Sequence, residues 1–146
     1  MIIDSHCHLN YEPISLSLKD TLQRANNDGV KYLLTISTED KSFDKILNII
    51  SNNKCVYGSY GIHPHEAKNH QYINSMDIIN KINLNKKIIG IGESGLDFYY
   101  NYSEKKDQIK CFEEHIIAAQ KTQIPLIVHT RNAETETFEI LKKRLI

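Results

Sequence analysis

Five short runs of apolar and β-branched residues alternate along this chain with longer segments of helical periodicity. One of these segments places Phe43, Ile46, Leu47 and Ile50 at positions i, i+3, i+4 and i+7, the stripe of an amphipathic helix. Strands that alternate with helices in this way form parallel sheets with crossover helices. The pattern therefore predicts an α/β fold, with strands at residues 2–3, 32–36, 56–60, 88–91 and 126–128.

Two α/β architectures fit this alternation, an open doubly wound sheet and a (β/α) barrel. The first strand is followed by DSHCHLN, so the glycine fingerprint of a dinucleotide-binding sheet is absent. Four of the strands end instead in ionisable residues, and barrel enzymes build their active sites at that edge. We therefore expect a TIM-like (β/α) barrel. Because complete barrels need about 250 residues, this chain of 146 residues is expected to hold about five βα units, as one partial domain over residues 1–146 that lacks the C-terminal strands.

The first strand ends in two histidines that flank a cysteine. Alternate residues of a strand share a face, so Asp4, His6 and His8 are expected to point one way and Cys7 the other. Two imidazoles at i and i+2 can converge on one metal ion, whereas a chance pair of surface histidines is the alternative. The preceding acid favours the metal, with Asp4 orienting one of the imidazoles.

Two further ligand candidates follow the fourth and fifth apolar runs. Glu93 comes directly after a Gly-rich strand in IIGIGESGLDFYY, although a solvated loop glutamate is the alternative. A carboxylate can bridge two cations through its two oxygens, which an imidazole cannot do, so we predict that Glu93 is both the bridging ligand and the catalytic residue of a two-metal site. His129 ends the run IPLIVHTR at the same edge and is predicted as a metal ligand, with a buried structural histidine as the alternative.

The other ionisable residues at this edge suit a substrate. His63 and His65 follow the third run and can contact substrate or a water. The fork of Arg131 matches phosphate oxygens, or forms a surface ion pair. Tyr99 and the tyrosine after it can stack on bases or pack within their loop. We predict a substrate-binding role for these residues. Asp97 is predicted to orient the metal ligands through hydrogen bonds. The alternatives are that it caps a helix or that it transfers a proton.

Composition narrows the function classes. A formal net charge of zero argues against a broad polycationic surface for nucleic acid, although metal ions can still hold such a substrate locally. The three cysteines are widely separated and odd in number, and neither a signal peptide nor an apolar run of membrane length is visible. We therefore expect a cytoplasmic protein without membrane contact. The motifs G-x-S-x-G and C-x-x-C and the P-loop do not occur.

Taken together, the stretches IIDSHCHL, YGSYGIHPHEA, IGESGLDFYY and PLIVHTRNAETETFEIL resemble the TatD family of metal-dependent deoxyribonucleases over nearly the whole chain. The resemblance implies a TIM-like barrel that uses two divalent ions (Mg, Mn or Zn) to hydrolyse phosphodiester bonds, with DNA as substrate and trimming from a 3′ end. It also implies that His6, His8, Glu93 and His129 are metal ligands. Ser94 departs from the family pattern, which has an apolar residue or Thr there.

The larger departure from the family pattern is length. Family members continue for roughly a hundred residues more, within the usual size of a barrel, and carry a further histidine ligand on the next strand and an aspartate on the last. A five-stranded arc leaves open strand edges, so we expect self-association or completion by a complementary C-terminal chain. The isolated chain is then expected to be inactive or weakly active. The alternatives are a catalytically silent metal-binding or structural remnant, and an amide or ester hydrolase of the wider barrel group.

Overall fold

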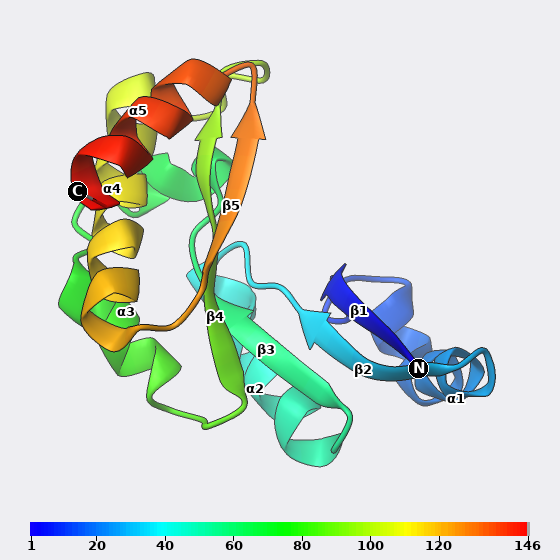
Figure 1. The fold of residues 1–146 in the computed structure, drawn as a ribbon. Coiled ribbons are helices and arrows are strands. Elements are labelled where there is room, and N and C mark those ends of the chain that lie inside the picture. Colours follow the sequence, from blue (N-terminus) through cyan, green and yellow to red (C-terminus); the bar gives the residue numbers. More distant parts are fainter. Residues whose placement is uncertain (146) are drawn as a thin grey trace.

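The computed structural model describes residues 1–145 and contains one sheet of five strands. All neighbouring strands pair in parallel, in the order β1-β2-β3-β4-β5, so that chain order and spatial order coincide. The curved sheet of five βα units is half of a barrel, as the sequence predicted (Figure 1). The strands are β1 (Ile2–Cys7), β2 (Val30–Thr35), β3 (Val56–Tyr60), β4 (Ile88–Asp97) and β5 (Leu126–Arg131).

A helix follows each strand, and the helices cover one face of the sheet. In Figure 1, α3, α4 and α5 lie on the same side of β4 and β5. No helix among the described residues is long and apolar enough to cross a membrane. The α-helices are α1 (Leu18–Asn27), α2 (Phe43–Asn52), α3 (Ser75–Ile82), α4 (Lys105–Thr122) and α5 (Glu134–Leu145), with short 3₁₀ helices at Ile14–Ser17, Asp40–Ser42 and Pro64–Asn69.

The core lies between the sheet and these helices, where the apolar stripes of the helices meet the strands. In α2, the buried residues Phe43, Ile46 and Ile50 belong to the stripe that the sequence predicted, and Leu47 packs against them at the margin. A second cluster beneath α4 and α5 contains Leu96, Phe112, Ile116 and Ala133. Burial of these faces is the main favourable contribution to folding.

The fourth strand is longer than the sequence predicted. The apolar run ends near residue 91, but β4 continues to Asp97 because its backbone keeps pairing with β5, from Ser94 opposite Val128 to Asp97 opposite Arg131. Apolar patterning detects where a strand is hydrophobic, whereas its end depends on how far a neighbouring strand can pair with it. Glu93 and Asp97 therefore lie on the strand itself and are buried.

The face of the sheet away from the helices carries exposed apolar side chains. Ile3 is 58% exposed and Ile89 is 44% exposed, and both line a shallow, mostly apolar hollow with Tyr32 and Tyr57. In a closed barrel the inward side chains of all strands pack against one another. This exposure agrees with the incomplete barrel that the sequence predicted.

Candidate metal centre

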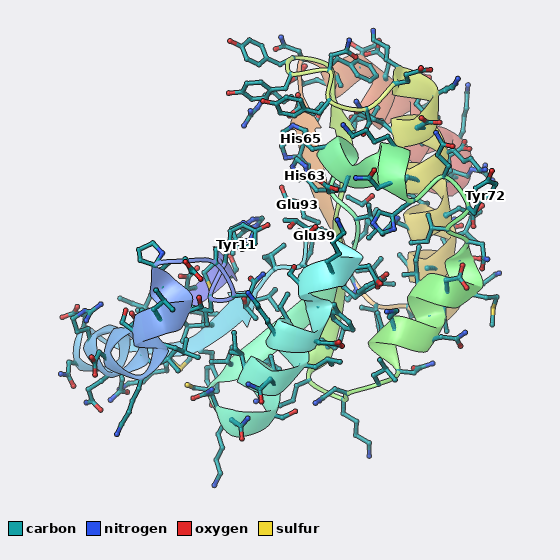
Figure 2. All side chains as sticks on the ribbon, turned by 180° about the vertical axis from the view of Figure 1, so that it is seen from behind. Tyr11, Glu39, His63, His65, Tyr72 and Glu93 are labelled. Atoms are coloured by element: carbon teal, nitrogen blue, oxygen red, sulfur yellow. The ribbon has the colours of Figure 1, made fainter. Side chains whose placement is uncertain are left out.

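The carboxyl ends of the strands converge on one pocket of about 420 Å³. His6 lies on β1, His8 directly after it, and His63 follows β3, while Glu93 and His129 lie on β4 and β5. Figure 2 shows Tyr11, His63, His65 and Glu93 gathered in this region. Parallel strands bring residues far apart in the sequence to one edge of a sheet, as the sequence analysis expected. The pocket is lined by His6, His8, Tyr11, Thr38, His63, His65, Glu66, Glu93, His129 and Arg131.

Glu93 lies at the centre of this arrangement, and each of its carboxylate oxygens faces a different imidazole. Its Oε1 is 2.9 Å from Nδ1 of His129, and its Oε2 is 3.3 Å from Nε2 of His6. The side chain of Glu93 is 11% exposed, so the carboxylate is directed into the pocket rather than into solvent.

Two groups of side chains around Glu93 fit a divalent metal ion. One consists of His6, His8 and Glu93, and the other of His63, Glu93 and His129. Within each group the candidate ligand atoms lie within 4.8 Å of one another, and Glu93 belongs to both. Mixed imidazole and carboxylate donors suit Zn²⁺, Mn²⁺ and related ions. The geometry therefore offers two adjacent sites that share one carboxylate.

The protonation of this cluster follows from its contacts. Burial alone would raise the pKa of Glu93, but the hydrogen bond with His129 and the charges of the nearby imidazoles outweigh it and lower that pKa below its usual value. The hydrogen bond with Glu93 raises the pKa of His129, against the effect of burial. Burial and the neighbouring His129 lower the pKa of His63 to about 4. Glu93 is thus an anion and His63 a neutral donor near pH 7.

Asp97 anchors the far side of the pocket. Its buried Oδ2 lies 2.9 Å from Nε2 of His65 and 3.1 Å from Nε2 of His129, and Nη1 of Arg131 is 3.8 Å away. Burial tends to raise the pKa of Asp97, but the hydrogen bonds from the Tyr100 backbone and from both imidazoles lower it to about 2. The carboxylate therefore holds two imidazole rings in place at once.

The remaining predicted residues are placed as follows. Oδ1 of Asp4 accepts the backbone N–H of His6 at 3.1 Å, and no hydrogen bond joins Asp4 to an imidazole among the described residues. Cys7 points away from the flanking histidines, as strand alternation predicted, and its thiol donates to the carbonyl of Leu34. Tyr99 is 62% exposed and lies outside the set of residues that line the pocket.

The structure brings His63 into the second ligand group, where its Nε2 lies 3.3 Å from Nδ1 of His129, and the sequence analysis did not predict this. The spacing H-P-H alone gave no sign of it, because the distance depends on how β3 and β5 flank β4. The predicted contact of His63 with substrate stays a prediction.

Several supporting residues were missed by the sequence analysis. The ring of His8 stacks on Tyr11, with centroids 5.1 Å apart, and the Tyr11 hydroxyl contacts the hydroxyl of Thr38. His115 is fully buried on α4, and its Nε2 accepts the backbone N–H of Ile62 at 3.1 Å, one residue before His63. A polar residue in the apolar stripe of α4 was the available signal for His115, but it does not name the partner.

Comparison with known proteins shows a family and several relatives that this chain resembles. A family model described as "TatD related DNase" matches residues 3–145. A protein of Buchnera aphidicola (subsp. Baizongia pistaciae) named as an uncharacterized metal-dependent hydrolase is 39% identical over 145 residues, which cover 97% of this chain and 54% of the relative. The deoxyribonuclease Tat-D of Schizosaccharomyces pombe is 30% identical over 134 residues, which cover 85% of this chain and 43% of the relative.

A solved structure agrees with the fold. The crystal structure of YjjV, a TatD homolog of Escherichia coli, superimposes with a TM-score of 0.90 at 26% sequence identity and covers 98% of this chain but 56% of that protein. The chain thus spans about half the length of the curated relatives it matches.

Proposed function

This chain belongs to the family of TatD-related DNases, and on that premise we propose that it forms the metal-binding part of a hydrolase that cleaves phosphodiester bonds of DNA from a 3′ end. The observation that carries the proposal is the position of Glu93, whose two oxygens face His6 and His129 and which belongs to both ligand groups. A carboxylate shared by two adjacent metal ions is a recurring design of phosphodiester-cleaving sites.

Two groups of residues in this chain would each bind a metal ion. His6, His8 and Glu93 would hold one divalent ion, and His63, Glu93 and His129 the other. Two such ions supply Lewis acidity that activates a water and offsets the charge of the phosphate. Glu93 remains ionised, because the surrounding imidazoles lower its pKa. The donor chemistry favours Zn²⁺ or Mn²⁺, and the family resemblance adds Mg²⁺.

Arg131 and His65 face the same pocket from the substrate side. The Arg131 side chain is 45% exposed and the His65 side chain 25% exposed, so both can reach a phosphate at the pocket mouth. A guanidinium pairs with phosphate oxygens through two parallel hydrogen bonds. The buried Oδ2 of Asp97 orients His65 through a hydrogen bond and lies 3.8 Å from Nη1 of Arg131.

Completion of the barrel by further strands belongs to the same proposal. The exposed apolar face that contains Ile3, Tyr32 and Ile89 suits a second polypeptide, equivalent to the part of the relatives that this chain does not span, or a second copy of this chain. Mixing the chain with the separately expressed C-terminal part of the Buchnera relative is expected to raise metal-dependent hydrolysis. No rise, together with a monomeric mass by light scattering, would contradict completion.

The test of the proposed function pairs hydrolysis with metal binding. The purified chain, mixed with the C-terminal part of the Buchnera relative and Mn²⁺, is expected to shorten a 5′-labelled single-stranded DNA. Glu93→Gln in this chain is expected to reduce the rate at least about 100-fold, since both ligand groups lose their shared carboxylate. Glu66→Gln is the matched control, because Glu66 lines the pocket outside both groups.

Binding of Mn²⁺ measured by calorimetry separates the outcomes. Binding that depends on Glu93 without any hydrolysis would identify a silent metal-binding remnant and reject the nuclease assignment for this chain. Equal hydrolysis by the wild type and by Glu93→Gln would reject the role of the shared carboxylate.

A further inference from the structure

The segment Ile36–Thr38 directly follows β2, the strand that supplies no member of either ligand group among the described residues. Because β2 lies between β1 and β3, its carboxyl end lies between the histidines that follow those two strands. Ile36 and Ser37 are fully buried, and Thr38 lines the pocket. In Figure 2, Glu39, which comes next in the chain, lies in the region of the pocket. We call Ile36–Thr38 the supporting segment.

The three successive backbone carbonyls of the supporting segment each accept a hydrogen bond from a different ligand candidate. The first carbonyl accepts from Nδ1 of His8 at 3.2 Å. The second accepts the backbone N–H of Glu93 at 3.0 Å, and the third accepts the backbone N–H of His63 at 2.8 Å. One tripeptide therefore contacts residues from the ends of β1 and β3 and from β4, and these residues belong to both ligand groups.

The contact with His8 decides which of its ring nitrogens can bind a metal ion. A carbonyl oxygen can only accept, so Nδ1 of His8 carries the proton and donates it to the carbonyl of Ile36. Nε2 then keeps its lone pair for a metal ion. The other end of the segment reaches the same ring, because the hydroxyl of Thr38 contacts that of Tyr11, whose ring stacks on His8.

Two fully buried serines hold the supporting segment in place. The backbone N–H of Ser37 donates to Oγ of Ser59 at 3.2 Å, and this hydroxyl donates to the carbonyl of Gly92 at 2.5 Å. Since the next N–H, that of Glu93, returns to the carbonyl of Ser37, these groups close a ring of hydrogen bonds. Oγ of Ser37 also donates to the carbonyl of Gly61 at 3.2 Å. Water cannot replace these partners easily at buried positions, so losing one of them is costly.

We infer that the supporting segment positions both ligand groups at once, so that a change in the ring of hydrogen bonds alters the two metal sites together. The inference rests on the two-metal site of the proposed function, to which it adds Ser37 and Ser59 as positioning residues. Besides the shared Glu93, the segment holds His8 in one group and His63 in the other. Removal of groups that orient metal ligands typically lowers metal affinity roughly 10- to 100-fold.

Ser59→Ala tests the supporting segment without changing a ligand. The variant removes two hydrogen bonds of the ring. In the metal-free chain, hydrogen exchange of the Glu93 and His63 amides is expected to become about tenfold faster relative to the amide of Ile116, which lies in the core on α4. Amide exchange followed by NMR measures this difference and separates local loosening from a general loss of stability.

Metal binding provides the second measurement. In Mn²⁺ titrations followed by calorimetry, Ser59→Ala is expected to lower the affinity of both sites about tenfold. The matched control is Ser94→Ala, which removes an equally buried hydroxyl next to Glu93 but outside the ring, and it is expected to behave like the wild type in both measurements. Ser37→Ala, which removes the hydrogen bond to Gly61, is the second variant if thermal unfolding shows that Ser59→Ala is misfolded.

Two results would overturn the inference. One is a rise in exchange at the Glu93 and His63 amides no larger than that at Ile116, which would assign the serines to general stability. The other is a loss of Mn²⁺ affinity confined to one site. Failure of the proposed function is seen separately, as absence of Glu93-dependent hydrolysis while amide exchange and Mn²⁺ binding still respond to Ser59→Ala.

Discussion

Two βα units of this sheet, β1–α1 and β4–α4, follow the same topology but differ in burial. None of the residues of β1 or α1 is buried, whereas all residues of β4 except Ile89 are. Figure 1 shows β1, β2 and α1 extending away from the part of the molecule where α3, α4 and α5 pack against β4 and β5. β4 has a strand on each side, while β1 pairs with β2 alone. Parallel pairing by itself therefore does not bury a strand; its neighbours and covering helix do.

The candidate metal centre joins these two unlike regions. The β1 side supplies His6, whose side chain is 44% exposed, and the β4–β5 side supplies Glu93 at 11% and His129 at 13%. The two ligand groups thus differ in how firmly the surrounding structure holds them. The ligand group with His63 and His129 contains no exposed side chain, whereas the ligand group with His6 and His8 contains the exposed His6.

The largest expected effect concerns glycines in the two regions. In β4, Gly95 has φ +153°, and a Cβ there would lie 1.9 Å from the carbonyl oxygen of His129. Gly95→Ala is therefore expected to force β4 and β5 apart and to lower the free energy of unfolding by more than about 4 kcal/mol. Urea unfolding followed by circular dichroism measures this change.

The matched substitution is Gly29→Ala, just before β2. Gly29 has φ +90°, but its nearest new contact, with Cδ1 of Ile2, is an ordinary 4.0 Å. Only the left-handed backbone conformation opposes alanine there, so we expect a loss of about 1–2 kcal/mol. Equal losses at both glycines would contradict the difference between the two regions.

A smaller effect is expected from protonation of the core beneath β4. His115 is fully buried, and burial lowers its pKa from 6.5 to about 4, with a further contribution from the charge of His70. The unfolded chain binds a proton near pH 6.5 and the folded chain only near pH 4, so this contribution to stability is complete above pH 6.5 and is lost as the pH falls toward 4. Between pH 7 and pH 5 the loss is about 2 kcal/mol.

Urea unfolding at pH 7, 6 and 5 measures this dependence. The variant His115→Gln removes the titrating group and is expected to show a flatter profile. A profile with the slope of the wild type would assign the pH dependence to other groups.

The smallest expected effect separates the two ligand groups. His129→Ala removes a shielded ligand, and His6→Ala removes an exposed one. Because electrostatic attraction is stronger where water is excluded, we expect the loss of Mn²⁺ affinity to be about tenfold larger for His129→Ala. Calorimetric titration measures both losses, with His70→Ala, outside both ligand groups, as control. A larger loss for His6→Ala would place the tighter site at the β1 end.

The amino-acid sequence by itself determined the order of the strands, the parallel topology and most of the residues that meet at the candidate metal centre. These follow from local periodicity and from one general rule, that parallel strands bring their carboxyl ends to a common edge. These candidates could be named in this way because each lies near the end of an apolar run: His6, His8, Glu93 and His129.

Only the tertiary structure decided how these residues meet. Three features depend on how separate elements of the fold meet. They are the extension of β4 to Asp97, the place of His63 in the second ligand group, and the hydrogen bonds from Gln108 on α4 to the loop that follows β4. The same holds for the two oxygens of Glu93, which face imidazoles from β1 and β5. Periodicity in a single sequence reports which face a residue occupies, whereas the curvature and pairing of the whole sheet decide what lies across from it.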